Sequence, residues 1–323
     1  MTEPIRWGVL GASKFAREQM ARAIHAAQGA ELAALGTSSA DKAAPFSAFA
    51  PGLRVHDGYD AVLADPDIDA VYIPLPHHLH APWALKAIAA GKHVLVEKPL
   101  GLRTEDFDPV IAARDASGLV VAEAYMIVHH PQWQRAKALL EEGAIGQLAH
   151  VRAAFCYNNA ADAGNIRNRP DIGGGSIPDI GVYTFGSVRL VTGQEPLSVI
   201  SDITREDGLE VTARVAATFP GFSFQSMTSM RMGAFQEVVF HGDTGAMRLS
   251  APFNPGVYGE ARIDVMAEGA ITRTERFPAA NHYVLQVENF CDAIRGKTAF
   301  RCPLEFSRGT QAMIDMVWAA ETG

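Results

Sequence analysis

Three side chains that can handle protons, Lys98, Asp179 and Tyr183, stand at positions where they could act together. Lys98 directly follows a hydrophobic segment, His93–Val96, and precedes Pro99. Ligands of an open α/β sheet bind beyond the carboxyl ends of its strands, so a lysine placed there can contact a bound cofactor and a substrate. Asp179 and Tyr183 are four residues apart, and on a helix this spacing puts two side chains on the same face.

These groups suit hydride transfer from an alcohol carbon, because that reaction also requires removal of the hydroxyl proton. Tyrosine is a poor base at its free pKa of about 10, but a nearby ammonium group favours the phenolate. We therefore predict that Tyr183 is the general acid/base, that Lys98 polarises the substrate oxygen and favours the tyrosinate, and that Asp179 orients a substrate hydroxyl. Each residue also has a structural explanation, as a solvated lysine, a capping aspartate after Ser176 or a packed helix aromatic, and only the combination favours catalysis.

The elements that would position these residues fall into two halves. Residues 5–123 alternate apolar segments with helical patterns, which is typical of βαβ units and a parallel sheet. The predicted strands are Ile5–Leu10, Glu31–Leu35, Arg54–His56, Ala70–Ile73, His93–Val96 and Leu119–Ala122, with helices near 15–27, 40–49, 82–90 and 104–117. In the second half, helices are predicted at Pro131–Glu142, 178–191, 282–294 and 304–321, with a strand at Leu148–Tyr157 and closely spaced β-type segments between 197 and 277. Such spacing suits antiparallel hairpins.

The first predicted strand runs into the turn Gly11-Ala12-Ser13-Lys14-Phe15-Ala16. This turn matches the dinucleotide fingerprint G-x-G-x-x-G/A at its first and last positions, with Ser13 where the middle glycine is expected. Serine is small and adds a hydroxyl donor, so the turn can still place a pyrophosphate at the amino terminus of the next helix. A tight strand–helix turn without a ligand is the alternative.

The end of the second predicted strand favours NADP over NAD. An NAD-specific site usually holds an acidic residue here, and none occurs before Asp41. The side chains present could donate to a 2′-phosphate or supply positive charge; they are Thr37, Ser38, Ser39, Lys14 and Lys42. Thr37–Ser39 could also simply cap the helix that starts near Ala40.

At this point the chain resembles the glucose-fructose oxidoreductase / inositol dehydrogenase / rhizopine-catabolism family, called Gfo/Idh/MocA. The resemblance covers nearly the whole chain, and the segments that carry it are Gly11–Ala16, Tyr72–Pro76 with His80, Gly91–Pro99 and Gly173–Tyr183. It implies a fold of class α/β, with a Rossmann dinucleotide-binding domain over residues 1–124. A C-terminal α+β domain with a large, open, mostly antiparallel sheet would follow over 125–323, for substrate binding and oligomerisation. It also implies NAD(P)-dependent oxidation or reduction of sugars, cyclic polyols and related alcohols.

A subgroup that includes dimeric dihydrodiol dehydrogenase, NADP-dependent xylose dehydrogenase and glucose-fructose oxidoreductase is similar in three further segments: Glu123–Met126, His130–Gln132 and Asn165–Arg167. The chain departs from this subgroup at Val128, where an arginine is usual, and at His129, where an aromatic is usual. Besides the residues named above, the predicted cofactor-binding residues are Pro74, Leu75, Pro76, His77, His80, Glu97 and Lys98. His77 and His80 are expected at a βα turn beside the cofactor, capping the next helix. The predicted substrate-binding residues are Asp179, His129, His130, Asn165 and Arg167, of which the last two could instead order their loop.

Composition excludes several other classes of function. The 323 residues carry a net charge of −8, and a mildly acidic chain is a poor candidate for nucleic acid. Its 3 cysteines fit neither a zinc site nor a disulfide framework, so we predict a cytoplasmic protein. No apolar stretch is long enough to span a membrane, and the start does not read as a signal peptide. His77, His78 and His80 lack a carboxylate or cysteine at metal spacing, so no metal is predicted.

The leading prediction is therefore an NAD(P)-dependent enzyme that acts on a sugar, cyclic polyol or dihydrodiol, as a homodimer or homotetramer through the C-terminal sheet. One alternative is a non-catalytic, sugar-sensing NAD(P)-binding regulator, which has no need of Lys98, Asp179 and Tyr183. Another is a sugar–sugar oxidoreductase with tightly bound NADP.

Overall fold

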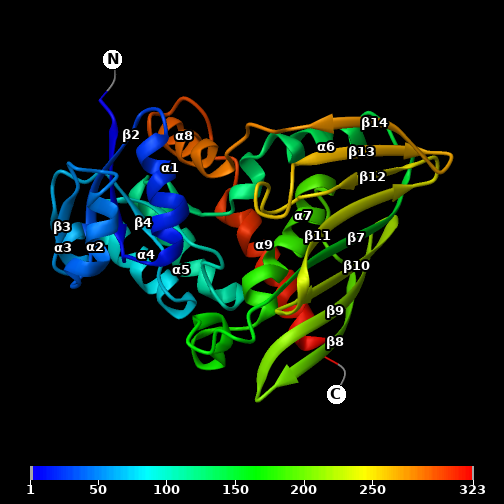
Figure 1. Ribbon diagram of the computed structural model, residues 1–323, viewed down its shortest axis with the longest axis horizontal. Helices are drawn as coiled ribbons and strands as arrows, with labels where there is room; N and C mark the ends of the chain where they lie inside the picture. Colours follow the sequence, from blue (N-terminus) through cyan, green and yellow to red (C-terminus); the bar gives the residue numbers. More distant parts are fainter. Residues whose placement is uncertain (1–2, 322–323) are drawn as a thin grey trace. The chain divides into compact units, whose positions relative to one another are not determined.

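The computed structural model describes residues 3–321, which divide into two compact units (Figure 1). The first unit comprises residues 3–129 together with Asn281–Ser307. The second unit comprises His130–Ala280 together with residues 308–321. Each unit has its own sheet.

Within the described residues, the first unit is built on a six-stranded parallel sheet in the order β3-β2-β1-β4-β5-β6. The strands are β1 (Ile5–Leu10), β2 (Ala30–Gly36), β3 (Arg54–His56), β4 (Ala70–Ile73), β5 (His93–Val96) and β6 (Val121–Glu123). The central strands are runs of apolar residues because helices cover both faces of such a sheet. The strand order reverses beside β1, and ligands of this fold bind at that position.

The helices of the first unit follow the predicted order with one addition. They are α1 (Ala21–Ala26), preceded by a π-helical turn Ala16–Met20, and α2 (Ala40–Ser47), α3 (Tyr59–Ala64), α4 (His80–Ala89), α5 (Phe107–Ser117) and α8 (His282–Ile294). The sequence did not predict α3, because six residues are too few for a visible helical period. The predicted strand Leu119–Ala122 starts two residues late and ends at Glu123, since the Val120 N–H donates to His93 Nδ1 rather than to a strand partner.

Helix α8 returns the chain to the first unit, although the sequence placed it in the domain 125–323. Asn281 caps it by accepting from two backbone N–H groups. Its apolar side, including Phe290 and Cys291, is buried in the same core as Trp7. An amphipathic pattern predicts that a helix buries one face, but not which core receives it.

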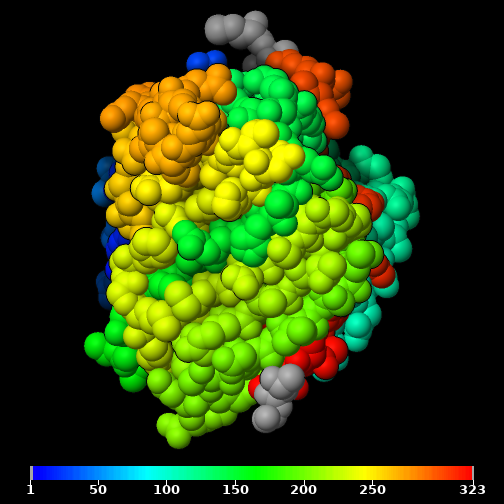
Figure 2. Space-filling view, turned by 90° about the vertical axis from the view of Figure 1, so that its right-hand side faces the viewer, coloured from blue at the N-terminus to red at the C-terminus, as the bar shows by residue number. Residues whose placement is uncertain are grey.

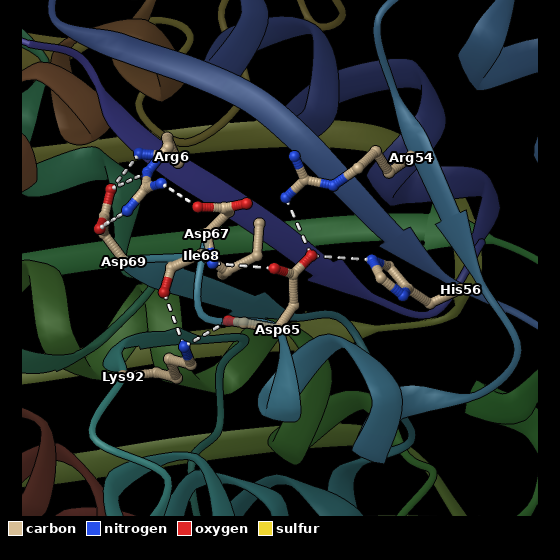
Figure 3. Close-up of polar contacts among 8 residues, drawn as sticks. All are labelled: Arg6, Arg54, His56, Asp65, Asp67, Ile68, Asp69 and Lys92. Carbon is tan, nitrogen blue, oxygen red and sulfur yellow. Dashed lines mark hydrogen bonds and ion pairs between the residues drawn. The ribbon is translucent and has the colours of Figure 1, made fainter.

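A polar network lies at the amino-terminal ends of β1, β4 and β5, opposite the edge where ligands are expected (Figure 3). Arg6 Nη2 and Nε donate to the two carboxylate oxygens of Asp69, at 2.8 and 3.0 Å. Burial disfavours the ionised Asp69, but the hydrogen bonds from Arg6 outweigh it and lower the pKa of this carboxyl. Lys92 Nζ donates to the backbone carbonyls of Asp65 and Ile68 at 2.7 and 2.8 Å. These bonds tie the starts of the strands together.

The second unit is built on an eight-stranded sheet, counted over the described residues, in the order β14-β13-β12-β11-β7-β10-β9-β8. The strands are β7 (Leu148–Asn158), β8 (Ser198–Glu206), β9 (Leu209–Phe219), β10 (Phe222–Ser229), β11 (Arg231–Gly242), β12 (Ala246–Leu249), β13 (Arg262–Ala267) and β14 (Ala270–Arg276). Only β7 and β10 pair in parallel among these strands, so the predicted, mostly antiparallel sheet is confirmed. The helices are α6 (Pro131–Glu141), α7 (Val182–Thr192) and α9 (Leu304–Ala319). Helix α9 belongs to this unit from residue 308 onward.

Helices α6, α7 and α9 lie along one face of this sheet (Figure 1), and the other face is open in the space-filling view (Figure 2). Side chains alternate along β10, where Phe222 and Phe224 are buried while Ser223 and Gln225 are exposed. Helix α7 packs against β7 and β10 on the buried side. Met230 is fully buried and belongs to the core of this unit.

Candidate active site

Lys98 lies at the carboxyl end of β5 with only 8% of its surface exposed. Two carboxylates accompany it, from the ends of β5 and β6. Glu97 accepts hydrogen bonds from Tyr72 Oη at 2.6 Å and from the Lys98 N–H at 3.3 Å, and burial raises the pKa of Glu97 to about 7. Glu123 accepts from the Leu100 N–H at 2.8 Å, and burial raises its pKa as well. The Lys98 ammonium opposes both shifts, so the three groups form one electrostatic cluster.

His80 is the first residue of α4, but it does not cap the helix as expected. It is fully buried, with Nδ1 2.7 Å from the Pro99 carbonyl oxygen and Nε2 2.6 Å from the Leu75 carbonyl oxygen. Burial lowers the pKa of His80 to about 4. The ring therefore ties the loop after β4 to the loop after β5, and any part it takes in cofactor binding goes through these loops. His77 lies in the 3₁₀ turn between Pro76 and α4.

The turn after β1 requires a glycine at its first position. Gly11 has φ +120°, and a Cβ there would lie 3.2 Å from Leu75 Cδ2 and 3.4 Å from Tyr59 Oη. Ser13, at the middle position of the fingerprint, accepts a hydrogen bond through Oγ from the Ala16 N–H at 3.1 Å. The Ser13 side chain thus caps the helical turn that follows it. Gly11 has no side chain that would crowd Leu75 and Tyr59.

The residues after β2 form a cap and also suit a phosphate. Thr37 Oγ1 accepts from the Ser39 N–H at 3.2 Å, and Ser39 Oγ accepts from the Lys42 N–H at 3.3 Å. Ser39 therefore caps α2, and the hydroxyl hydrogens of Thr37 and Ser39 remain able to donate. Lys14 and Lys42 are exposed. A donor set of hydroxyls and ammonium groups without a carboxylate fits the 2′-phosphate of NADP.

Asp179 lies on a π-helical turn, Ile177–Gly181, that leads into α7. Its Oδ2 accepts a hydrogen bond from Tyr157 Oη at 2.7 Å and pairs with Arg167 Nε at 2.8 Å. The side chain of Asp179 is 6% exposed and that of Arg167 is 37% exposed. The structure thus brings together two residues predicted for the site, Asp179 and Arg167, and adds Tyr157 from β7.

The start of this helix is capped by Glu210 of β9, and not by Ser176 with Asp179, which was the alternative explanation for Asp179. Glu210 accepts from Ser176 Oγ and from the Ile177 N–H at 2.7 Å, and burial raises its pKa. The glycines before Ser176 make room for these contacts. A Cβ on Gly175, which has φ +125°, would lie 2.9 Å from Glu210 Oε2, and one on Gly174 would lie 2.6 Å from the carbonyl oxygen of Arg167.

Tyr183 is in the first turn of α7, and its ring packs among aromatic side chains. Ring centroids of Phe155 and Phe253 lie 5.7 and 5.6 Å from that of Tyr183. The tyrosine is 6% exposed. Tyr183 also interacts electrostatically with Arg167.

The other residues predicted to bind substrate are placed less favourably. His129, in the first unit, and His130, in the second, are 1% and 0% exposed. His130 caps α6 by accepting from the Gln132 N–H. Asn165 accepts from the Arg167 N–H and donates to Asp162 Oδ2, so its contacts order the loop.

Sequence reasoning missed the partners Tyr157 and Glu210. Each meets its site residue across at least 22 positions of chain and carries no local motif. Tyr72 and Glu123 were noticed only as part of a resemblance.

Within residues 3–321 no group of three or more histidine, cysteine, aspartate or glutamate side chains is arranged to hold a metal ion. Over the same residues, no helix is both long and apolar enough to cross a membrane.

The strand order and the turn after β1 are those of a Rossmann dinucleotide-binding domain. Residues 5–125 match the model described as an oxidoreductase family with an NAD-binding Rossmann fold, and residues 133–248 match the GFO/IDH/MocA C-terminal domain. The chain belongs to the Gfo/Idh/MocA family, and the resemblance stated from its motifs is confirmed.

Similar proteins align with nearly the whole chain. An uncharacterized oxidoreductase of Rhizobium meliloti, ORF334, is 36% identical over 99% of this chain and 98% of its own. D-xylose 1-dehydrogenase (NADP(+)) 2 of Haloferax volcanii is 30% identical over 98% of each chain. Among solved structures, KijD10, a 3-ketoreductase from Actinomadura kijaniata in complex with NADP and TDP-benzene, superposes with a TM-score of 0.88 at 29% identity, over 99% of this chain and 98% of that one.

Proposed function

We propose that this oxidoreductase transfers a hydride between NADP and a carbon that bears a hydroxyl or carbonyl group on a sugar, cyclic polyol or dihydrodiol. The observation that carries the proposal is the buried Lys98 at the carboxyl end of β5, with Glu97 and Glu123 beside it. A buried ammonium is costly unless it is compensated, so its retention at the ligand-binding edge favours a chemical role.

The cofactor supplies or accepts the hydride when bound. The residues proposed to hold it are those at the ends of β1, β2, β4 and β5: Gly11, Ala12, Ser13, Lys14, Phe15, Ala16, Thr37, Ser38, Ser39, Lys42, Pro74, Leu75, Pro76, His77, His80, Glu97 and Lys98. NADP is preferred over NAD because no carboxylate follows β2. The NADP bound to KijD10 and the name of the xylose dehydrogenase support this preference.

Tyr183 and Lys98 are proposed to handle the proton. In the direction of reduction, the Tyr183 phenol donates its proton to the substrate oxygen while the Lys98 ammonium stabilises the negative charge that develops there. In the direction of oxidation the tyrosinate takes the hydroxyl proton back. Asp179 is proposed to orient a neighbouring hydroxyl of the substrate.

The names of the relatives suggest which substrates to try first. KijD10 is a ketoreductase that was solved with a TDP compound, and the Haloferax protein is named for an aldose. A panel should therefore contain nucleotide-linked ketosugars, free aldoses, cyclic polyols and dihydrodiols, each followed by NADPH or NADH fluorescence.

The test of the proposal is turnover by Lys98→Met with any substrate found in this panel. Lys86→Met is a matched control, because Lys86 is an exposed lysine on α4 of the same unit. We expect the rate to fall by at least about 100-fold in Lys98→Met, the usual effect of removing a group that stabilises developing charge. Lys86→Met should leave the rate unchanged. Similar rates in both variants would reject the role of Lys98.

The open face of the second sheet is proposed to pair with a second copy of the chain. Ile200 on β8 is 66% exposed there, beside Ala216 of β9 in the sheet register. Ion pairs such as Arg152–Glu237 flank this apolar part of the face. A face that combines exposed apolar and paired charged side chains suits a contact between subunits.

A further inference from the structure

Two donors hold the carboxylate of Asp179 by the same oxygen. Arg167 Nε lies 2.8 Å and Tyr157 Oη 2.7 Å from Asp179 Oδ2. Because Asp179 is almost fully buried, this arrangement keeps an ionised carboxylate in a place where it would otherwise be unfavourable. The positive charge of Arg167 is therefore part of the site rather than a surface feature.

The loop that carries Arg167 is fixed by its own contacts. The Arg167 N–H donates to Asn165 Oδ1 at 3.1 Å, and its carbonyl oxygen accepts from the Gly175 N–H at 3.0 Å. Arg231 Nη1 reaches into the same loop, to Asn168 Oδ1 at 3.2 Å. The guanidinium is thus positioned before any ligand binds.

Tyr157 is a hydrogen-bond donor and not an acid/base in this arrangement. Burial, and then the negative charge of Asp179, raise its pKa far above the ordinary value of a phenol. Tyr157 keeps its proton throughout the usable pH range. Of the two tyrosines near Arg167, only Tyr183 remains as a candidate to exchange a proton.

Arg167 acts on Tyr183 as well as on Asp179. The negative charge of Asp179 is the main reason that the pKa of the Arg167 guanidinium is raised, and an ionised Tyr183 would raise it further. Electrostatic coupling is reciprocal, so a cation that is stabilised by an ionised Tyr183 stabilises that ionised form by the same amount. Other charged and titratable groups around Tyr183 in this unit include Asp179, which disfavours the tyrosinate, and the neutral phenol of Tyr258, which borders Asp179.

We propose that Arg167 is a positioning residue for the proton transfer: it holds Asp179 in place and cancels the carboxylate's charge at Tyr183, so that the phenol can give up its proton. This inference rests on the proposed function, in which Tyr183 exchanges a proton with the substrate. Without Arg167, the buried Asp179 would face Tyr183 as an unbalanced anion. With Arg167 present, the Arg167–Asp179 ion pair carries no net charge.

The test is the titration of Tyr183 in the NADP-bound enzyme, followed by NMR of protein labelled with ¹³C at tyrosine Cζ. The signal of Tyr183 is the one that disappears in Tyr183→Phe. Removing a neighbouring opposite charge shifts a pKa by about 1 unit or more, and the part-exposed Arg167 should act at the lower end of this range. We therefore expect Arg167→Met to raise the titration midpoint by about 1 pH unit, with a smaller shift in Arg167→Lys.

A double-mutant cycle separates this electrostatic role from a structural one. Asp179→Asn should lower the midpoint, and Arg167→Met with Asp179→Asn should return it close to the wild-type value, because both charges are then absent. If Arg167 and Asp179 only support the local structure, the two substitutions should not shift the titration midpoint of Tyr183 in opposite directions, and the double variant should not return to the wild-type midpoint. An unchanged midpoint in Arg167→Met, or a double variant that titrates like Arg167→Met, would overturn the proposal.

The titration does not depend on turnover, so it distinguishes the two proposals. If the shifts occur but Tyr183→Phe turns over substrate at the wild-type rate, Arg167 controls the pKa of Tyr183 and the proton-handling role proposed for Tyr183 is wrong. If both proposals hold, the pH below which alcohol oxidation slows moves upward in Arg167→Met by the same amount as the NMR midpoint.

Discussion

Gly175 provides a sharp test of how the helix that carries Asp179 and Tyr183 is held. Alanine there meets two penalties. At φ +125° a residue with a side chain is strained by about 1–3 kcal/mol. The new Cβ would also lie 2.9 Å from Glu210 Oε2, the oxygen that accepts from the Ile177 N–H.

Displacing Glu210 weakens a charge-assisted cap, which contributes about 1.5–3 kcal/mol. We therefore expect Gly175→Ala to lower the free energy of unfolding of the second unit by about 2.5–6 kcal/mol, the sum of strain and lost cap. Gly221→Ala is the matched control, because Gly221 also has positive φ, at +84°, but a Cβ there would meet nothing within 4 Å. It should cost only the strain, about 1–2 kcal/mol.

Urea unfolding followed by far-ultraviolet circular dichroism measures both variants, and the rate of NADPH oxidation at saturating substrate measures the site. We expect the rate to fall in Gly175→Ala and to be unchanged in Gly221→Ala. Equal losses of stability in the two variants, or full activity in Gly175→Ala, would refute the reasoning about Glu210.

Three further predictions follow from other parts of the chain. Ser38→Asp places a carboxylate where the 2′-phosphate of NADP is proposed to bind. KM for NADPH should therefore rise about tenfold or more while KM for NADH changes little. An equal rise in both KM values would contradict the binding of the 2′-phosphate beside Ser38. The pKa of Glu97 is raised to about 7 from 4.5, so the folded state loses stability as pH rises between these values, by at most about 3 kcal/mol. The temperature at which Glu97→Gln unfolds should therefore depend less on pH over this interval than that of the wild type. The same dependence on pH in both proteins would contradict the raised pKa of Glu97. Ala216→Glu on the open sheet face should convert the proposed dimer or tetramer into smaller species in sedimentation velocity, whereas the exposed Ala26→Glu on α1 should not; a wild type that sediments as a monomer would refute the pairing.

The strands of the first unit could be read from the sequence because each signal is local. A buried parallel strand is a short apolar run, and β1, β4 and β5 have the predicted bounds. Helix α3 was missed because it is short, and the unit to which α8 belongs was missed because amphipathicity does not identify a partner. The antiparallel nature of the second sheet followed from its short turns, whereas its strand order follows from long-range contacts that no local pattern contains.

The residues of the candidate site could likewise be predicted only where the signal is local. Lys98 and Tyr183 could be named because each follows a recognisable motif, but their partners could not. Tyr157 and Glu210 lie on strands whose alternating pattern predicts only which face is buried, and the bonds to Asp179 and to Ile177 N–H depend on how distant segments meet. Glu210 also takes the place of the capping box that was the alternative explanation for Asp179, since a carboxylate at a helix start accepts from both Ser176 Oγ and the Ile177 N–H.

The central claim is that Tyr183 moves the substrate's proton, and the rate of a single turnover of NADPH oxidation by Tyr183→Phe tests it most directly. Phenylalanine preserves the ring contacts with Phe155 and Phe253 and removes only the hydroxyl. We predict a rate about 100- to 10,000-fold below that of the wild type, the usual contribution of a general acid, with unchanged binding of NADPH. A single-turnover rate within twofold of the wild type would contradict the claim.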